Sequence, residues 1–296
     1  MTIHPLFALT ALLCAAALTA PSFAAAPAMA TVTPALAAKE ALPPGAKILS
    51  LEIAPAAVTL HGCFDAIQLL VTAKLANGDT IDVTRLATYA VAAPSAAVTA
   101  AGQVAPLANG KTSVTATLAG KSAQAALEVV GYDPHAKVDF IRDVNPVLAQ
   151  LGCSAGACHG AKDGKAGFKL SLRGYDPIFD VRSLVDDHAG RRINFASPDD
   201  SLMLLKATGA VPHEGGQRTK FDDKYYRIMR AWIADGAKLD LSVPRVVRIE
   251  VTPLNPVLQV IGSKQQMRII ATYADGRQRD VTAEGFIESG NQDVAL

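Results

Sequence analysis

Short apolar runs that are rich in β-branched residues, separated by glycine-containing turns, fill residues 47–131. The first clear run is 68–74, and others follow at 113–118 and 123–130. Runs of this length bounded by turn residues are typical of β-strands. Short strands at regular spacing therefore predict an all-β sandwich domain over 47–131.

Three segments of this domain return later in the chain at one constant offset of 198 residues. The matched pairs are 51–55 with 249–253 (Leu-Glu-Ile-Ala-Pro with Ile-Glu-Val-Thr-Pro), Asn77-Gly78 with Asp275-Gly276, and Asp82-Val83-Thr84 with Asp280-Val281-Thr282. The Asn-Gly and Asp-Gly pairs favour tight hairpin turns. We name 47–131 the first repeat and 244–296 the second repeat. The second is expected to be a partial copy of the same β domain, and the chain to be part of a longer protein.

Between the repeats the apolar residues recur at steps of three and four, which is typical of amphipathic helices. One such face is Val138, Phe140, Ile141, Val144, Val147, Leu148 and Leu151, and another is Phe221, Tyr225, Ile228, Met229, Trp232 and Ile233. Pro146 is expected to kink or start the first helix. Asp222-Asp223 and Gly236 are expected to bound the second. Residues 132–243 therefore predict a small all-α domain.

The first 38 residues contain no Asp, Glu, Lys or Arg. Their apolar run, 6–20, is shorter than the roughly 20 residues that span a bilayer, and Ser22-Phe23-Ala24 follows it as a cleavage pattern. We expect a signal peptide over 1–25 and export to the periplasm or cell surface. Any membrane association would come from an uncleaved signal, since residues 1–5 lack Lys and Arg. Ala, Pro and Thr over 26–46 predict a linker.

Composition and charge exclude several classes of function. The 28 basic and 27 acidic residues are balanced, and no block of five like charges occurs. A groove that follows phosphates, and hence a nucleic-acid partner, has no support. No Ser/His/Asp, paired-carboxylate or phosphate-loop pattern is recognisable either. The chain is therefore predicted not to be an enzyme, with a catalytic domain beyond Leu296 left open.

The chemistry of the sequence is concentrated in Cys153-Ser-Ala-Gly-Ala-Cys158-His159. A histidine directly after a short cysteine-to-cysteine loop is the arrangement that attaches haem c. Each thiol would form a thioether with a haem vinyl group, and His159 would bind the iron. The loop holds four residues instead of the usual two. Two alternatives stay open: a Cys153–Cys158 disulfide, and a zinc site that adds His159 and a further histidine.

The order of elements around this motif resembles small cytochromes c. There, a helix, the Cys-His motif, a loop with the distal iron ligand and a closing helix follow one another. Residues 138–237 resemble most closely the cytochrome-c-like domain of large exported planctomycete proteins. The Leu-Glu-Ile-Ala-Pro and Tyr-Ala-Asp-Gly-Arg-Gln-Arg-Asp-Val-Thr segments resemble bacterial Ig-like domains of group 2, which accompany that domain in those proteins. The implied order is an Ig-like sandwich, an all-α cytochrome-c-like domain over 132–243, and a truncated second Ig-like domain.

The resemblance implies one covalent haem c, bound through Cys153 and Cys158, with His159 as an iron ligand. His213, in the loop Val-Pro-His-Glu-Gly-Gly at 211–216, is the expected distal ligand, with Met203 or an open position as alternatives. His188 is expected on the surface. The candidates for binding the haem propionates are Arg173, Arg191 and Arg192, which could equally form a solvated basic cluster.

The predicted function is an exported electron-transfer module, in which one haem c is carried between Ig-like domains. Its partners would be redox proteins or a C-terminal domain of the same longer chain. The alternative is a surface adhesion or scaffold protein, in which Cys153 and Cys158 form a disulfide and no haem binds. A gas or redox sensor would need an exchangeable sixth iron position.

Overall fold

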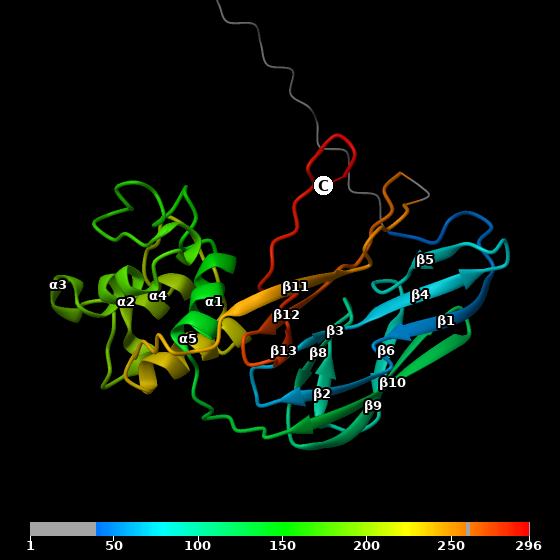
Figure 1. Cartoon of the computed structure of the whole chain (residues 1–296), viewed down its shortest axis with the longest axis horizontal. Helices are drawn as coiled ribbons and strands as arrows, with labels where there is room; N and C mark the ends of the chain where they lie inside the picture. Colours follow the sequence, from blue (N-terminus) through cyan, green and yellow to red (C-terminus); the bar gives the residue numbers. More distant parts are fainter. Residues whose placement is uncertain (1–39, 259–260, 296) are drawn as a thin grey trace, which may run out of the picture. The chain divides into compact units, whose positions relative to one another are not determined.

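The computed structural model describes residues 40–258 and 261–295 (Figure 1). The predicted signal peptide, 1–25, and the first part of the predicted linker, 26–39, lie outside the described residues. The described part of the chain forms thirteen β-strands and five short helices. None of these helices is long and apolar enough to cross a membrane.

The first repeat is an all-β domain, and its β content is compatible with the predicted Ig-like sandwich. Its strands are β1 (Ile48–Ala54), β2 (Ala57–His61), β3 (Ile67–Gln68), β4 (Leu70–Leu75), β5 (Thr80–Asp82), β6 (Thr88–Val91), β7 (Ala96–Val98), β8 (Gln103–Pro106), β9 (Gly110–Leu118) and β10 (Lys121–Val130). They form three sheets, in the orders β1-β4-β5, β2-β10-β9-β6 and β3-β8-β7. Side chains of β9 and β10 cover the inner face of the β1 sheet, where the buried Ala116 packs with Leu51 and Val71 and the partly buried Ala123 packs against them.

The second repeat forms the sheet β11-β12-β13, which reproduces the sheet β1-β4-β5. Its strands are β11 (Val246–Thr252), β12 (Arg268–Tyr273) and β13 (Gln278–Asp280). Ile48 pairs with Leu75, and Val246 pairs with Tyr273, at the same offset of 198 residues. Each edge strand has a register shift two residues further on, at Ser50 and Arg248. The internal repeat predicted from the sequence is therefore reproduced in strand register.

The residues that recur between the repeats make the same hydrogen bonds. The Thr84 hydroxyl accepts from the backbone N–H of Val71 at 2.8 Å, and that of Thr282 accepts from Ile269 at 2.8 Å. In each repeat the aspartate two positions earlier accepts from the threonine N–H. The Asp-Val-Thr motif recurs because it ties the end of the third strand to the middle strand.

The same aspartates also join the two repeats to each other. Asp82 Oδ2 accepts from the backbone N–H of Gln266 at 2.5 Å, and Asp280 Oδ2 accepts from that of Gln68 at 2.9 Å. Gln68 and Gln266 are themselves one repeat offset apart. The exchange is thus reciprocal, like the self-complementary contacts of a twofold-symmetric dimer. We name these two bonds the repeat interface.

Residues 132–243 do not form the predicted all-α, cytochrome-c-like domain, and this part of the fold prediction is wrong. The helices are α1 (Asn145–Gln150), α2 (Pro177–Val185), α3 (Asp187–Gly190), α4 (Leu202–Thr208) and α5 (Lys224–Ala234). The segment 151–171, which follows α1, contains turns, bends and one isolated β-bridge between Lys165 and Phe168, and no helix. Gly152, Gly164 and Gly167 adopt positive φ angles there, which a right-handed helix excludes.

The first predicted helix is divided where its proline lies. A π-helical turn over Phe140–Val144 precedes α1, and Pro146 occupies the first turn of α1. A proline is tolerated there because its missing N–H would have no intrahelical partner. The periodicity over 138–151 therefore predicted correctly which side chains are buried. It did not predict that the segment divides into a π-helical turn and an α-helix.

The second predicted helix is confirmed as α5. The Asp223 carboxylate caps it, accepting from the backbone N–H of Tyr226 at 2.9 Å. Ile228, Met229, Trp232 and Ile233 are buried as expected. Phe221 lies before the helix and is exposed, because the capping aspartate starts the helix three residues after it.

A buried ion cluster joins residues 132–243 to the second repeat. Arg279 Nη1 lies 2.7 Å from Asp143 Oδ1, and Arg142 Nη2 lies 2.8 Å from Asp143 Oδ2. Burial alone would raise the pKa of the Asp143 carboxyl, but the hydrogen bond from Arg142 and the charge of Arg279 outweigh it. The pKa therefore lies below its usual value of 3.8.

Candidate cofactor-binding site

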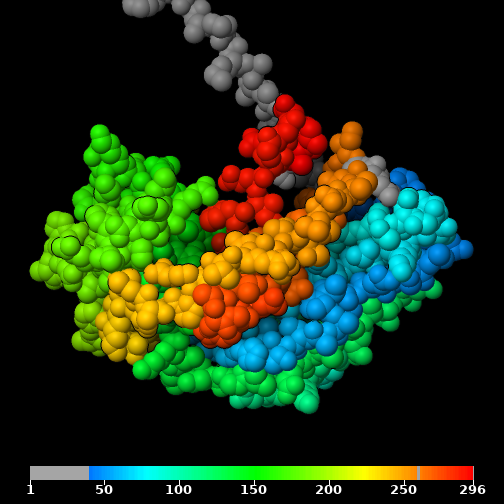
Figure 2. All heavy atoms as spheres, in the orientation of Figure 1, coloured from blue at the N-terminus to red at the C-terminus, as the bar shows by residue number. Residues whose placement is uncertain are grey.

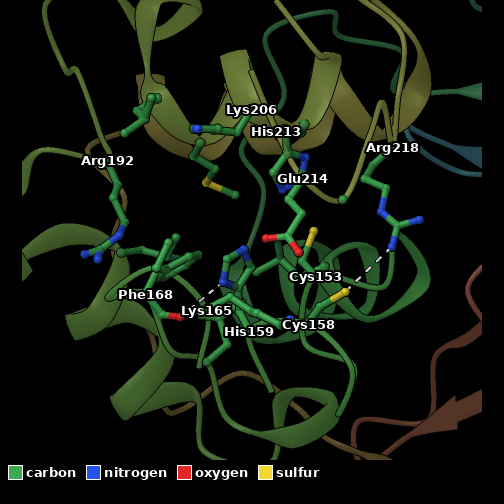
Figure 3. Close-up of a pocket in the computed structure, with 18 of the residues that line it drawn as sticks. Cys153, Cys158, His159, Lys165, Phe168, Arg192, Lys206, His213, Glu214 and Arg218 are labelled. Carbon is green, nitrogen blue, oxygen red and sulfur yellow. Dashed lines mark hydrogen bonds between the residues drawn. The ribbon is translucent and has the colours of Figure 1, made fainter. Parts of the chain in front are cut away.

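A cavity of about 540 Å³ opens between the cysteine motif, α4 and the loop after it (Figure 3). This volume is typical of pockets that bind small organic ligands and cofactors. Both motif cysteines line it, together with His159 and His213. The four residues predicted to bind haem and iron, which come from two segments of the chain, thus border one cavity.

Backbone hydrogen bonds fold the cysteine motif into a closed loop. The N–H of Cys153 donates to the carbonyl of Leu148 at 2.9 Å, and that of His159 donates to the carbonyl of Cys153 at 3.0 Å. A Cβ atom at Gly160 would lie 2.1 Å from the Ser154 carbonyl oxygen, so only glycine fits directly after the histidine. This closure places both thiols and the imidazole on the cavity wall.

The two motif cysteines are free thiols in the structure. Burial raises the pKa of the Cys153 thiol to about 11, so this sulfur stays protonated at neutral pH. Arg218 Nη2 lies 3.8 Å from the Cys158 sulfur. Both cysteine side chains are half-buried. A protonated thiol is a poor metal ligand or nucleophile, because both roles need the thiolate.

His159 presents one ring nitrogen to the cavity. Its Nδ1 lies 3.1 Å from the carbonyl oxygen of Phe168, and because a carbonyl only accepts, Nδ1 carries the proton. The lone pair is then on Nε2. Burial lowers the pKa of His159, which favours the neutral imidazole that binds metal ions.

His213 is held in the same way from the opposite side of the cavity (Figure 3). Its Nδ1 lies 2.8 Å from the carbonyl oxygen of Gly216, which leaves the Nε2 lone pair free. A Cβ atom at Gly215 would come within 3.0 Å of the His213 ring. The Gly-Gly pair thus supplies both the carbonyl that fixes the ring and the space that the ring occupies.

The two imidazoles are 6.4 Å apart between ring centroids, and their planes differ by 9°. An imidazole nitrogen binds a metal ion at about 2 Å, so the centroids of two rings on either side of one ion are roughly 6 Å apart. A histidine that binds metal usually donates its other N–H to a carbonyl or carboxylate. Both rings meet that description.

The donor set fits haem iron better than a zinc ion. The described residues contain no group of three or more His, Cys, Asp or Glu side chains placed to hold a metal ion. A structural zinc site needs four protein ligands, so the zinc alternative lacks a ligand set there. A porphyrin would supply four ligands itself, and His159 and His213 would supply the remaining two.

The other predicted residues differ in where they lie. Met203, Arg191 and Arg192 line the cavity, whereas Arg173 does not. The Arg192 guanidinium donates to two backbone carbonyls, of Ser183 at 2.7 Å and Gly167 at 3.0 Å, so it supports the wall. Arg173 instead lies 3.7 Å from Glu288.

Comparison with known proteins yields little. No model of a known protein family matches the chain, and no curated protein matches it. A solved structure of domains 4 and 5 of the S-layer protein SbsC is 18% identical, with a TM-score of 0.24, over 29% of this chain and 54% of that one. A structure of SbsC domains 4–9 is 19% identical, with a TM-score of 0.24, over 31% and 15%. At these TM-scores neither likeness indicates a shared fold or function.

Sequence reasoning missed several residues of the cavity wall. These are Lys165, His188, Lys206, Glu214 and Arg218. His188 is exposed, as the aspartates before it led us to expect, and it also borders the cavity. No local signal identifies the others, since the folding of separate turns around one cavity brings them together. Most of them are basic, so the wall favours an anionic ligand.

Proposed function

We propose that the chain binds one haem c covalently through Cys153 and Cys158, with His159 and His213 as the iron ligands, and that it is an electron carrier. One observation carries this proposal. Two nearly parallel imidazoles, whose Nδ1 atoms are each held by a backbone carbonyl, have ring centroids 6.4 Å apart in a cavity that both thiols also line.

The residues around the cavity would have different roles in binding haem. Leu148, Leu170 and Leu184 give it an apolar floor, which would exclude water from the porphyrin plane. Arg191 and Arg218 line the cavity, and each would pair with a propionate, because a guanidinium binds carboxylates through two parallel hydrogen bonds. Bound haem supplies one-electron oxidation and reduction. Two imidazole ligands favour a lower reduction potential than the His/Met pair of many cytochromes c.

Export is part of the proposal. Its support is the uncharged N-terminal segment with its apolar run and cleavage pattern, together with the extracytoplasmic attachment of haem c in bacteria. Partners of an exported carrier would be other redox proteins or further domains of a longer chain.

The test is expression of the full chain in a host that both exports and matures c-type cytochromes. We expect haem to remain on the polypeptide after denaturing electrophoresis. The spectrum is expected to be low-spin, without the near-infrared band of sulfur bound to ferric iron, and Met203→Leu to leave it unchanged. A colourless protein with a mapped Cys153–Cys158 disulfide would contradict the proposal.

That outcome would favour the second candidate function, a surface scaffold. The repeat interface supports this candidate, because two β repeats that bond directly to each other suit a rigid structural element. The scaffold needs no cofactor, and its cysteines would only cross-link the 153–158 loop.

Gly215→Ala is expected to weaken ligation by His213. The added Cβ lies 3.0 Å from ring atom Cε1, and relieving such overpacking costs about 1–3 kcal/mol. This corresponds to a loss of roughly five- to 150-fold in ligation by His213, seen as a fall in the low-spin fraction. Gly156→Ala is the control, because its nearest neighbour is a Leu172 methyl group at 3.7 Å. Equal spectra for the two variants would argue against His213 as a ligand.

A further inference from the structure

The second repeat leaves uncovered an apolar face that is covered in the first. Ile249 is 60% exposed, whereas its counterpart one repeat earlier, Leu51, is 8% exposed. Val246 is 44% exposed against 8% for its counterpart Ile48. In Figure 2 the orange side chains of β11 lie at the molecular surface.

The opposite face of the same strands serves as an internal reference. Val247 and its counterpart Leu49 are 66% and 53% exposed, so the outward side chains of the two repeats are alike. The two repeats therefore differ in side-chain exposure at the inward positions of this strand and not at the outward one. They share the strand register and the hydrogen bonds of the Asp-Val-Thr motif. The difference in exposure thus reflects a missing cover and not a different sheet.

The first repeat shows what covers such a face. Strands β9 and β10 form an antiparallel hairpin that lies against β1, and it contributes the small side chains Ala116 and Ala123 to the cluster around Leu51. The matching position in the second repeat is only partly covered, because it borders a cavity of about 260 Å³ that Ile141, Arg142 and Pro146 also line. Its wall includes Val246, Ile249 and the buried side chain of Glu284, whose Oε2 has no hydrogen-bond partner among the described residues. Buried polar atoms are rarely left unpaired.

We propose that this face binds a β-hairpin of the β9–β10 pattern, with small apolar residues turned inward, and that the hairpin belongs to polypeptide continuing the second repeat. The hairpin buries Ile249 and Val246 as its counterpart buries Leu51 and Ile48. The proposal depends on neither the cysteines nor haem.

The repeat offset supplies a direct test. Leu296 corresponds to Val98, so a second copy of residues 99–131 is appended to the full chain immediately after Leu296. We expect a monomer in which the amides of β11 exchange at least about tenfold more slowly and the Tm rises by about 5 °C. The measurements are hydrogen exchange, light scattering and thermal unfolding.

Matched variants of the extended chain identify the binding face. Ile249→Asp, at an exposed position that tolerates the change, is expected to remove both the slow exchange and the rise in Tm. Leu49→Asp, on the outward face of the first repeat, is expected to keep both. An appended segment that gives neither protection nor a Tm rise would overturn the proposal. So would a dimer that Ile249→Asp dissolves, since the face would then bind a second copy.

Discussion

The double variant Cys153→Ala, Cys158→Ala is expected to lose covalent haem completely. Each thioether needs one of these thiols, and both line the cavity between His159 and His213. The haem signal retained after denaturing electrophoresis should fall from that of the wild type to background. Either single variant keeps one thioether and should retain a reduced signal. Haem that the two histidines still bind without covalent attachment should be extracted by acidified organic solvent.

Cys63→Ala is the matched control for this experiment. Cys63 is also a free thiol, and it is more buried than the two motif cysteines, but it lies in the first repeat and does not line the cavity. We expect its haem signal to equal that of the wild type. If the double cysteine variant kept its signal, another residue would have to hold the haem.

The variant Asp143→Asn is expected to lower the free energy of unfolding by about 3 kcal/mol. Asp143 is the shared counter-ion of Arg142 and Arg279. Removing its charge leaves the half-buried Arg142 without its ion pair, and leaves Arg279 with Asp65, 3.9 Å away, as its remaining ion pair in the described part of the chain. Urea denaturation measures the loss. Glu128→Gln is the control, because Glu128 pairs at 3.9 Å with the exposed Lys111 and surface pairs contribute about 0–1 kcal/mol.

The same carboxylate has a defined pH dependence. Because the pKa of Asp143 lies below its usual value of 3.8, its contribution is fully present well above that value. It is lost as the pH falls through the lower pKa of the folded state. Between pH 7 and pH 5 the difference between the wild type and Asp143→Asn should stay constant, and below pH 4 it should shrink. A difference that persisted undiminished at pH 2 would assign the stabilisation to a cause other than this charge.

The repeat was predictable because its signals are local. Turn dipeptides and the Asp-Val-Thr motif act on residues a few positions away, and their recurrence at one offset shows that the local structure recurs too. The repeat interface was not predictable. Its bonds join residues about two hundred positions apart, and the sequence of Asp82 or Gln266 contains no sign of a distant partner.

The candidate site likewise contains some residues that the local sequence predicts and others that only the folded chain brings together. Cys153, Cys158 and His159 were predicted because they are close in sequence. His213 was predicted because its loop precedes a helix whose start and buried face could also be predicted. Lys206, on α4, and Glu214 and Arg218, in the loop after it, line the cavity because separate segments fold around it. The all-α prediction failed for a related reason. Apolar periodicity indicates which side chains are buried, but it does not show how short the helices between the repeats are, at 4 to 11 residues.

The repeat interface also determines how the molecule would respond to tension. Residues 132–243 are inserted between two β domains that are bonded directly to each other through Asp82 and Asp280. A pulling force applied at the two ends of the chain has two parallel paths, one through these short bonds and one through the inserted region. The bonded path is the shorter and stiffer, so it carries the load first. The cavity between His159 and His213 is mechanically shielded until the repeats separate.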